Sequence, residues 1–174
     1  MQSTARLVTA AQRGDRDAFA ELVRRYERVV VMTAWAVVRD FHAAEDIAQD
    51  SFLHAYDSLL SLRRPESFGS WLLKSTHRAA VRRSRRQRHD VPLDTIVEPP
   101  VDVAESEWHV EFQAIAHVIG RLTVHEREVI VFRYVNGLSV AEIADATDRP
   151  IGTVSKQISR ALQRLREIFT GIET

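Results

Sequence analysis

Residues 121–167 decide the fold of this chain: RLTVHEREVIVFRYVNGLSVAEIADATDRPIGTVSKQISRALQRLRE. Two capping boxes stand in this stretch, Thr123 with Glu126 and Ser139 with Glu142. In a capping box, each of the two side chains accepts a hydrogen bond from a backbone N–H that the first turn of a helix leaves unpaired. The stretch therefore predicts two separate helix starts.

The same stretch signals where its helices end. Asn136-Gly137 is typical of a left-handed C-cap and closes the first helix. The second helix is short, and the turn 148–152 separates it from a third helix that we expect to open at Thr153. One side of the third helix is apolar. Its other side is polar and cationic and consists of Ser155, Lys156, Gln157, Ser159, Arg160, Gln163 and Arg164.

A short helix, a tight turn and a longer helix with a cationic face are typical of the helix-turn-helix, whose second helix enters the major groove of DNA. An ordinary helical hairpin with a solvated face has the same periodicity. The sequence itself favours the first reading. LTVHEREVIVFRYVNGLSVAEIA (122–144) and PIGTVSKQISRALQRLR (150–166) resemble the fourth, promoter-reading region of bacterial sigma factors of the extracytoplasmic-function (ECF) group.

Composition limits the function classes. The chain has 174 residues, enough for one domain or two small ones, and its 24 Lys+Arg balance its 24 Asp+Glu. It contains no cysteine, so it has no disulfide framework and no thiolate metal site. No signal peptide is visible, and the longest apolar stretch, 29–38, is too short to span a bilayer. We therefore expect a cytoplasmic protein that is not inserted in a membrane.

The N-terminal half has an unevenly charged helix. After a predicted core helix from Asp15 to Val38, a second helix over 43–60 lies in a segment without Lys or Arg. Five of its residues share one face at steps of three and four: Asp46, Gln49, Asp50, Leu53 and Asp57. A solvated face is the alternative reading. AAEDIAQDSFLHAY (43–56), however, resembles the second region of the same family. The resemblance implies that Asp46, Gln49, Asp50 and Leu53 bind the β′ clamp helices of core RNA polymerase.

The next helix is basic. Ser67 or Ser70 is expected to cap it, and 67–89 contains no acidic residue. Phe68 and Trp71 stand at its head, followed by Lys74, Arg78, Arg82, Arg83, Arg85, Arg86 and Arg88. This combination suits phosphate neutralisation together with base stacking on opened strands. The alternatives are a surface helix with a solvated arginine tail and a helix on a membrane surface, although the latter lacks a broad apolar face.

The resemblance assigns DNA contacts to both basic surfaces. For the minus-ten element, which this part of the family recognises and melts, it implies Arg64, Phe68, Trp71, Lys74, Arg78, Arg82 and Arg85. Arg78 and Arg82 depart from the Asn and Asp common in the family, which points to stronger phosphate contacts. For the minus-thirty-five element it implies Arg149, Thr153, Ser155, Lys156, Gln157, Arg160 and Arg164. Lys156, Gln157 and Arg160 are expected to read base edges.

An acidic segment joins the two halves. From position 90 to position 120 the chain has three prolines and no Lys or Arg. It also has seven acidic residues there, at positions 90, 94, 98, 102, 105, 107 and 111. The segment reads as an extended tether, and the family's strand-like path through the RNA exit channel is the functional alternative. A helix restarts near Glu105 and ends near Gly120. We therefore expect an all-α protein of two small domains, 1–90 and 108–174, joined by the linker 91–107.

No catalytic, cofactor or metal motif is present, and the resemblance implies none. It implies a dissociable subunit that gives core RNA polymerase its promoter specificity, with core polymerase, promoter DNA and a possible anti-sigma factor as partners. The main alternative is a polymerase-independent helix-turn-helix regulator that binds an operator as a dimer. A protein that only sequesters a partner comes next, and an enzyme last.

Overall fold

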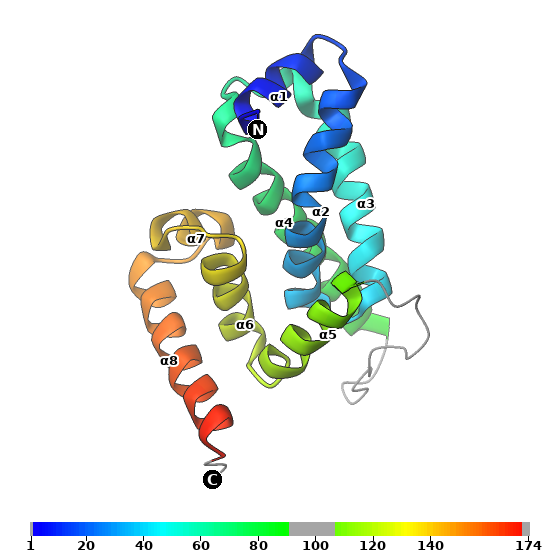
Figure 1. The fold of residues 1–174 in the computed structure, drawn as a ribbon. Coiled ribbons are helices and arrows are strands. Elements are labelled where there is room, and N and C mark those ends of the chain that lie inside the picture. The colour runs from blue at the N-terminus through cyan, green and yellow to red at the C-terminus, as the bar shows by residue number, and fades with distance from the viewer. Residues whose placement is uncertain (1, 91–106, 172–174) are drawn as a thin grey trace.

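A computed structural model describes residues 2–90 and 107–171 and is helical throughout this part, with no strand (Figure 1). The N-terminal lobe consists of α1 (Thr4–Gln12), α2 (Arg16–Val38), α3 (Phe41–Ser58), the 3-10 turns η1 (Leu59–Ser61) and η2 (Pro65–Ser67), and α4 (Phe68–Asp90). The C-terminal lobe consists of α5 (Glu107–Ile119), α6 (Val124–Ile130), the π-helical turn η3 (Val131–Val135), α7 (Val140–Thr147) and α8 (Ile151–Thr170). The predicted all-α class is confirmed. The predicted linker lies almost wholly outside the described residues.

The N-terminal lobe is built around α2, which packs against both α3 and α4. Asp15 and Asp40 cap α2 and α3, because their carboxylates accept hydrogen bonds from the backbone N–H groups of Ala18 and Ala43. Helix α1 was not predicted from the sequence. Its signals were Ser3, whose hydroxyl accepts from Arg6, and an apolar side that is now buried against α2.

The start of α4 differs from the prediction. Neither candidate serine caps it: the Ser67 hydroxyl donates to the carbonyl of Arg64, and the Ser70 hydroxyl donates to the carbonyl of Ser67. The 3-10 turn η2, which begins with Pro65, leads the chain into the helix instead. A proline suits this place because it has no N–H to leave unpaired and its φ is already helical.

In the C-terminal lobe both predicted capping boxes are present, at Thr123 and Ser139. Gly137 adopts φ 71°, the left-handed conformation expected after Asn136. One boundary was wrong, because α8 begins at Ile151, two residues before Thr153. Pro150 takes the N-cap position there, and its ring fixes a φ compatible with the start of a helix.

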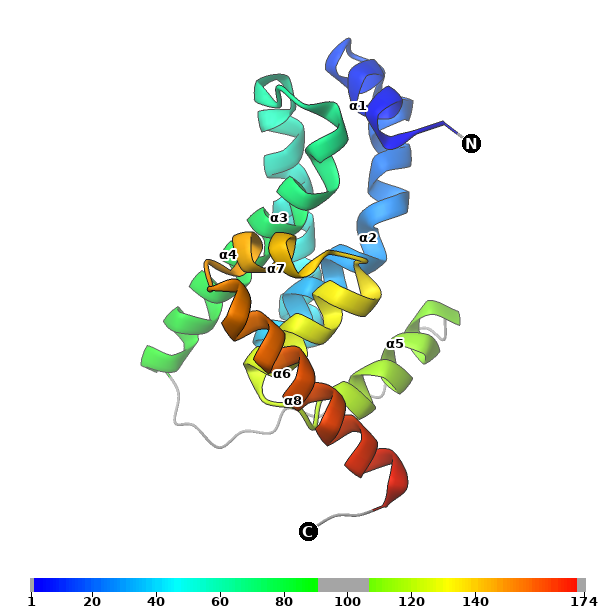
Figure 2. The same ribbon diagram turned by 90° about the vertical axis from the view of Figure 1, so that its left-hand side faces the viewer.

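The two lobes pack on each other. α6 lies against α2, and α7 lies against α4, as the two views together show (Figures 1 and 2). An aromatic cluster joins α5 to the N-terminal lobe: the ring centroid of Phe112 is 5.5 Å from that of Trp35 and 4.8 Å from that of Phe41. Edge-to-face pairs of this kind contribute about 0.5–1.5 kcal/mol beyond the area they bury. The described parts of the chain therefore share one core.

Candidate nucleic-acid interface

Helix α8 presents a cationic face to solvent. Val154 and Ala161 are buried against the rest of the C-terminal lobe, which orients the helix. Four residues predicted to contact DNA then lie exposed on its outer side: Thr153, Ser155, Lys156 and Arg160. The helix stands at the edge of the molecule and packs on one side against α6 (Figure 1). This geometry leaves it free to enter a groove of a DNA duplex.

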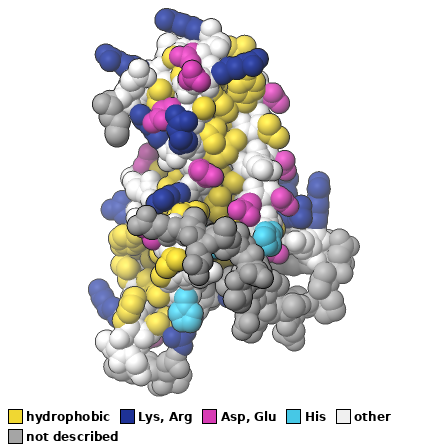
Figure 3. Space-filling model, turned by 45° about the vertical axis from the view of Figure 1, so that its right-hand side comes forward, with side chains coloured by type: hydrophobic (Ala, Val, Ile, Leu, Met, Phe, Trp, Pro, Cys, Tyr) yellow, Lys and Arg dark blue, Asp and Glu magenta, His cyan; other side chains and the backbone are white. Residues whose placement is uncertain are grey.

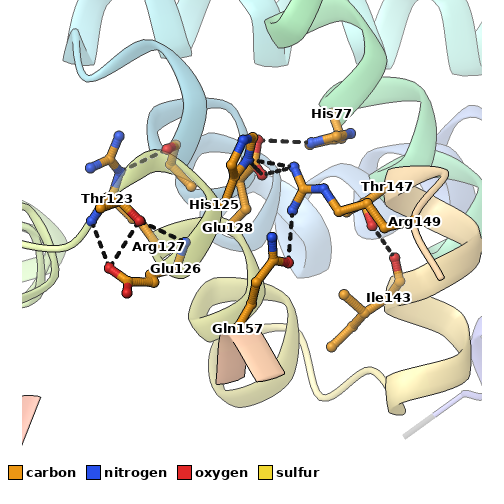
Figure 4. Close-up of polar contacts among 11 residues, drawn as sticks. His77, Thr123, His125, Glu126, Arg127, Glu128, Ile143, Thr147, Arg149 and Gln157 are labelled. Atoms are coloured by element: carbon orange, nitrogen blue, oxygen red, sulfur yellow. Dashed lines mark hydrogen bonds and ion pairs between the residues drawn. The ribbon is translucent and has the colours of Figure 1, made fainter. Parts of the chain in front are cut away.

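Two other predicted arginines are held by carboxylates of α6. The side chain of Arg149 is only 16% exposed, forms an ion pair with Glu128, and donates to the Gln157 side-chain oxygen at 3.4 Å (Figure 4). Arg164 donates to Glu126 at 3.0 Å. Both arginines therefore stabilise the lobe in this conformation, whatever they do toward DNA.

The basic helix α4 divides into two parts. Arg82 and Arg85 are exposed. Lys74 and Arg78 face α7 instead and pair with Asp145 at 2.8 Å and with Asp148 at 3.4 Å. Two acidic residues of the helix-turn-helix therefore form ion pairs with Lys74 and Arg78, which the family resemblance assigned to the minus-ten element.

The aromatic residues at the head of α4 differ from each other. Phe68 is completely buried and packs edge-on against Tyr26, with ring centroids 5.5 Å apart. A ring in the core cannot stack on a base, so the predicted DNA contact of Phe68 does not hold in this structure. Trp71 is half-buried and lies roughly parallel to the ring of His54 at 6.0 Å, and Arg64 is exposed in the loop before η2. The side chains of Trp71 and Arg64 are therefore still accessible to DNA in this structure.

The acidic face of α3 is open. Asp46, Gln49 and Asp50 are exposed, and Leu53 is 66% exposed. Two further apolar side chains, Tyr56 and Leu60, extend the face, and Leu60 is 79% exposed. Figure 3 turns this side of the molecule toward the viewer and shows acidic side chains beside exposed hydrophobic ones. Sequence reasoning missed Tyr56 and Leu60, although they follow Leu53 at helical spacing.

The lobe interface contains a carboxylate that sequence reasoning also missed. Glu128 has a side chain 3% exposed, and its two oxygens contact His77 of α4 at 3.2 Å and His125 at 3.3 Å, besides Arg149 (Figure 4). Burial by itself raises a carboxyl pKa. Here the hydrogen bond and charge of His77, together with those of Arg149, outweigh burial and lower the pKa of Glu128 to about 2.

Other kinds of site are not seen in the part of the chain that the structure describes. No group of three or more His, Cys, Asp or Glu side chains is placed to hold a metal ion there. Over the same residues, each helix is too short or too polar to cross a bilayer.

A helix-turn-helix with an exposed cationic second helix, joined to a second helical lobe with basic and acidic faces, defines a two-lobed DNA-binding protein. Comparisons with known proteins agree. The model of the sigma-70 region 2 family matches residues 22–89, and that of sigma-70 region 4 matches residues 112–165. The chain is 30% identical to the ECF RNA polymerase sigma factor SigM of Mycobacterium tuberculosis over 99% of this chain and 88% of that protein. It belongs to the ECF family of RNA polymerase sigma factors.

Further relatives agree in sequence and in fold. The ECF RNA polymerase sigma factor SigW of Bacillus subtilis is 29% identical, over 92% of this chain and 93% of that protein. CnrH, solved in complex with the cytosolic domain of CnrY, matches 99% of this chain and 100% of its own with a TM-score of 0.70 at 22% identity. The sigma factor RpoE of Bartonella quintana, solved with the anti-sigma factor NepR, matches 87% of this chain and 96% of its own with a TM-score of 0.70 at 20% identity.

Proposed function

We propose that this chain binds core RNA polymerase through α3 and directs it to promoters through α4 and α8. The main support for the proposal is that this chain, a member of the family, exposes an acidic and apolar face on α3 and a cationic face on α8. A dimeric operator-binding regulator has no use for the first of these faces. The proposed role needs no catalytic group, and it places the protein in the cytoplasm with the polymerase.

On α3, Asp46, Gln49 and Asp50 would contact polar and basic groups of the β′ clamp helices. Leu53 would lie in the apolar centre of the contact, because protein interfaces have an apolar core and a polar rim. Tyr56 and Leu60 enlarge the apolar part of the same face. All of these groups are accessible in the described conformation.

On α8, Lys156, Gln157 and Arg160 would read base edges of the minus-thirty-five element, with Thr153 nearer the phosphates at the helix start. On α4, Arg82 and Arg85 would neutralise phosphates of the minus-ten element. Arg64 and Trp71 would contact the opened strand. The N-terminal domain, 1–90, would therefore melt DNA, and the C-terminal domain, 108–174, would anchor it.

An anti-sigma factor is a further proposed partner. Its support is the fold shared with RpoE, whose solved structure contains the anti-sigma factor NepR.

The test is co-purification with core RNA polymerase, comparing the wild type with Asp46→Arg/Asp50→Arg. The matched control is Glu27→Arg/Glu167→Arg, which reverses two acids on α2 and α8, outside the proposed contact. We expect the wild type and the control to bind and the α3 variant to lose binding. A wild type that ignores polymerase, while binding a symmetric operator by itself, would overturn the proposal in favour of the dimeric regulator.

A second measurement examines promoter choice. Holoenzyme containing the wild type is used to select promoters from a random library, and Arg160→Ala is then compared on the selected sequence. If Arg160 reads a guanine, its loss should cost about 1–3 kcal/mol and relax specificity at one base pair.

A further inference from the structure

Arg149 stands in the turn between the two helices of the helix-turn-helix, and its backbone is fixed on both sides. Asp148 before it is the C-cap of α7, with φ 53°, and Pro150 after it is the N-cap of α8. A residue that precedes proline is restricted to an extended conformation by the proline ring. The backbone N–H of Arg149 also donates to the carbonyl of Ala144 at 3.0 Å. The turn therefore limits the directions that the Arg149 side chain can take.

The side chain of Arg149 points into the protein. It is only 16% exposed and forms an ion pair with Glu128 of α6 (Figure 4). The same guanidinium nitrogen lies 2.8 Å from Nδ1 of His125. The other oxygen of Glu128 contacts Nε2 of His77 at 3.2 Å, so the anchor of Arg149 is itself held in place. A guanidinium bound in this way is not free to neutralise a phosphate, although the sequence places Arg149 among the DNA contacts.

The anchor keeps its negative charge at neutral pH. Burial raises the pKa of the Glu128 carboxyl, but the hydrogen bonds and charges of His77 and Arg149 lower it to about 2. A charged carboxylate and a guanidinium form a pair of defined geometry, because the N–H groups of arginine lie in one plane and point in fixed directions. Once Glu128 holds one side of the guanidinium, the direction of the remaining N–H groups is set.

One of those N–H groups meets Gln157 of α8. Nη1 of Arg149 donates to the side-chain oxygen of Gln157 at 3.4 Å (Figure 4). Gln157 is half-buried and lies between the buried Val154 and the exposed side of the helix that carries Lys156. Arginine has only donors, so the oxygen of the amide must face it and the NH2 group must face away. Arg149 therefore selects one of the two orientations of the Gln157 amide.

The orientation of this amide decides which base edge it can recognise. A glutamine that is free to turn pairs with adenine, because its NH2 group donates to N7 while its oxygen accepts from the N6 amino group. In this chain the oxygen of Gln157 already accepts from a charged donor, so the amide offers chiefly its N–H donors. Guanine presents two neighbouring acceptors, N7 and O6, in the major groove. An amide that only donates therefore fits guanine better than adenine.

We propose that Arg149 is a positioning residue that gives Gln157 a preference for guanine at one base pair of the minus-thirty-five element. Arg149 acts through Gln157 and does not contact DNA, and Glu128 anchors it from the interior of the protein. The inference deepens the proposed function and rests on it for the identity of the DNA element. The contacts from Glu128 to Gln157, however, belong to the folded chain itself.

The test is a selection of promoters by holoenzyme from a library that is randomised in the minus-thirty-five element. Gln157→Ala identifies the base pair concerned, because the preference should disappear only there. Arg149→Lys is the critical variant: its ammonium keeps a positive charge beside Glu128 but lacks the planar fork that reaches Glu128 and Gln157 together. Arg166→Lys is the matched control, because it makes the same change at an exposed arginine of α8 outside the proposed contacts.

We expect the wild type and Arg166→Lys to prefer guanine at the base pair that Gln157→Ala identifies. Arg149→Lys should lower the ratio of guanine to adenine there about 5-fold or more, starting from the lower end of the discrimination that a good base contact provides. Preferences at the other base pairs should not change. Circular dichroism and urea denaturation of each full-length variant check that a lost preference does not come from lost folding.

A double-mutant cycle shows whether Arg149 acts through Gln157. Arg149→Met removes the donors and keeps an unbranched side chain, so it should shift the base preference of the wild type but not that of Gln157→Ala. If it instead weakens binding to all sequences equally and lowers the salt dependence, Arg149 contacts a phosphate and the inference is wrong. The inference is also wrong if Arg149→Lys keeps the full guanine preference, or if Gln157→Ala changes no base pair.

The two proposals fail differently. If no variant binds core polymerase, the proposed function fails, and the same selection is made with the free chain on duplex DNA. A guanine preference of the free chain that Arg149→Lys removes would then support the inference, and its absence would overturn it. If the wild-type holoenzyme selects promoters in which the base pair of Gln157 is not a guanine, the inference fails and the proposed function stands.

Discussion

Replacing Glu128 by glutamine should weaken the packing of the two lobes strongly. The carboxyl pKa falls from 4.5 to about 2 in the folded protein, and one pKa unit corresponds to about 1.4 kcal/mol. The charged form is therefore favoured on folding by about 3 kcal/mol, which agrees with the 3–5 kcal/mol typical of breaking a buried ion pair. Glutamine keeps the shape but leaves His77 and Arg149 without a charged partner. We expect the variant to lose about 3 kcal/mol of unfolding free energy at pH 7.

The sign of the pH dependence follows from the same pKa. A carboxyl group whose pKa is lowered by folding contributes its full stabilisation above its unfolded pKa, near 4.5, and loses it as the pH falls toward about 2. The difference between the wild type and Glu128→Gln should therefore shrink as the pH falls from about 5 toward 2. Other acids titrate equally in both proteins, so they cancel in the difference.

The measurement is urea denaturation of both full-length proteins at a series of pH values, followed by circular dichroism. Glu27→Gln is the control, because this exposed glutamate of α2 lies outside the lobe interface. It should unfold at the same urea concentration as the wild type. If Glu128→Gln also does so, or if the difference does not shrink in acid, Glu128 does not hold the lobes as described.

Three more substitutions test the packing and one helix cap, each by urea denaturation of the full chain. Arg127→Ala should cost about 3–5 kcal/mol of unfolding free energy, because the side chain is buried, donates to two backbone carbonyls, and lies over the ring of Trp35 at 5.6 Å. Arg127→Lys should recover only part of this free energy. Full recovery would contradict the role of the planar guanidinium. Gly69→Ala should cost about 1–3 kcal/mol, because the new methyl group would lie 2.7 Å from the Tyr26 hydroxyl; a simultaneous Tyr26→Phe substitution should relieve part of the cost. Ser139→Ala should cost about 1 kcal/mol through loss of the α7 cap, whereas Ser139→Asp should be nearly neutral.

Much of the candidate site could be predicted because its signals are local. Lys156 and Arg160 lie on the outer face of α8 because apolar residues at helical spacing turn the opposite side toward the core. Asp46 and Asp50 are exposed on α3 for the same reason. Phe68 shows the limit of this reasoning: an aromatic residue at the head of a basic helix suits base stacking, but only the packing of α2 against α4 shows that its ring belongs to the core.

The sequence by itself determined the helical class, the capped starts of α6 and α7, and the charged faces of α3, α4 and α8. These features depend on residues a few positions apart, and a helix brings such residues together wherever it lies. Only the tertiary structure decided that the two lobes close on each other, because His77 and Glu128 are 51 residues apart and Lys74 and Asp145 are 71 apart. A pair of opposite charges becomes an interaction only when the fold brings the two within a few ångströms, and burial then determines its strength. The same acids and bases that look like separate surfaces in the sequence therefore pair with each other in the folded chain.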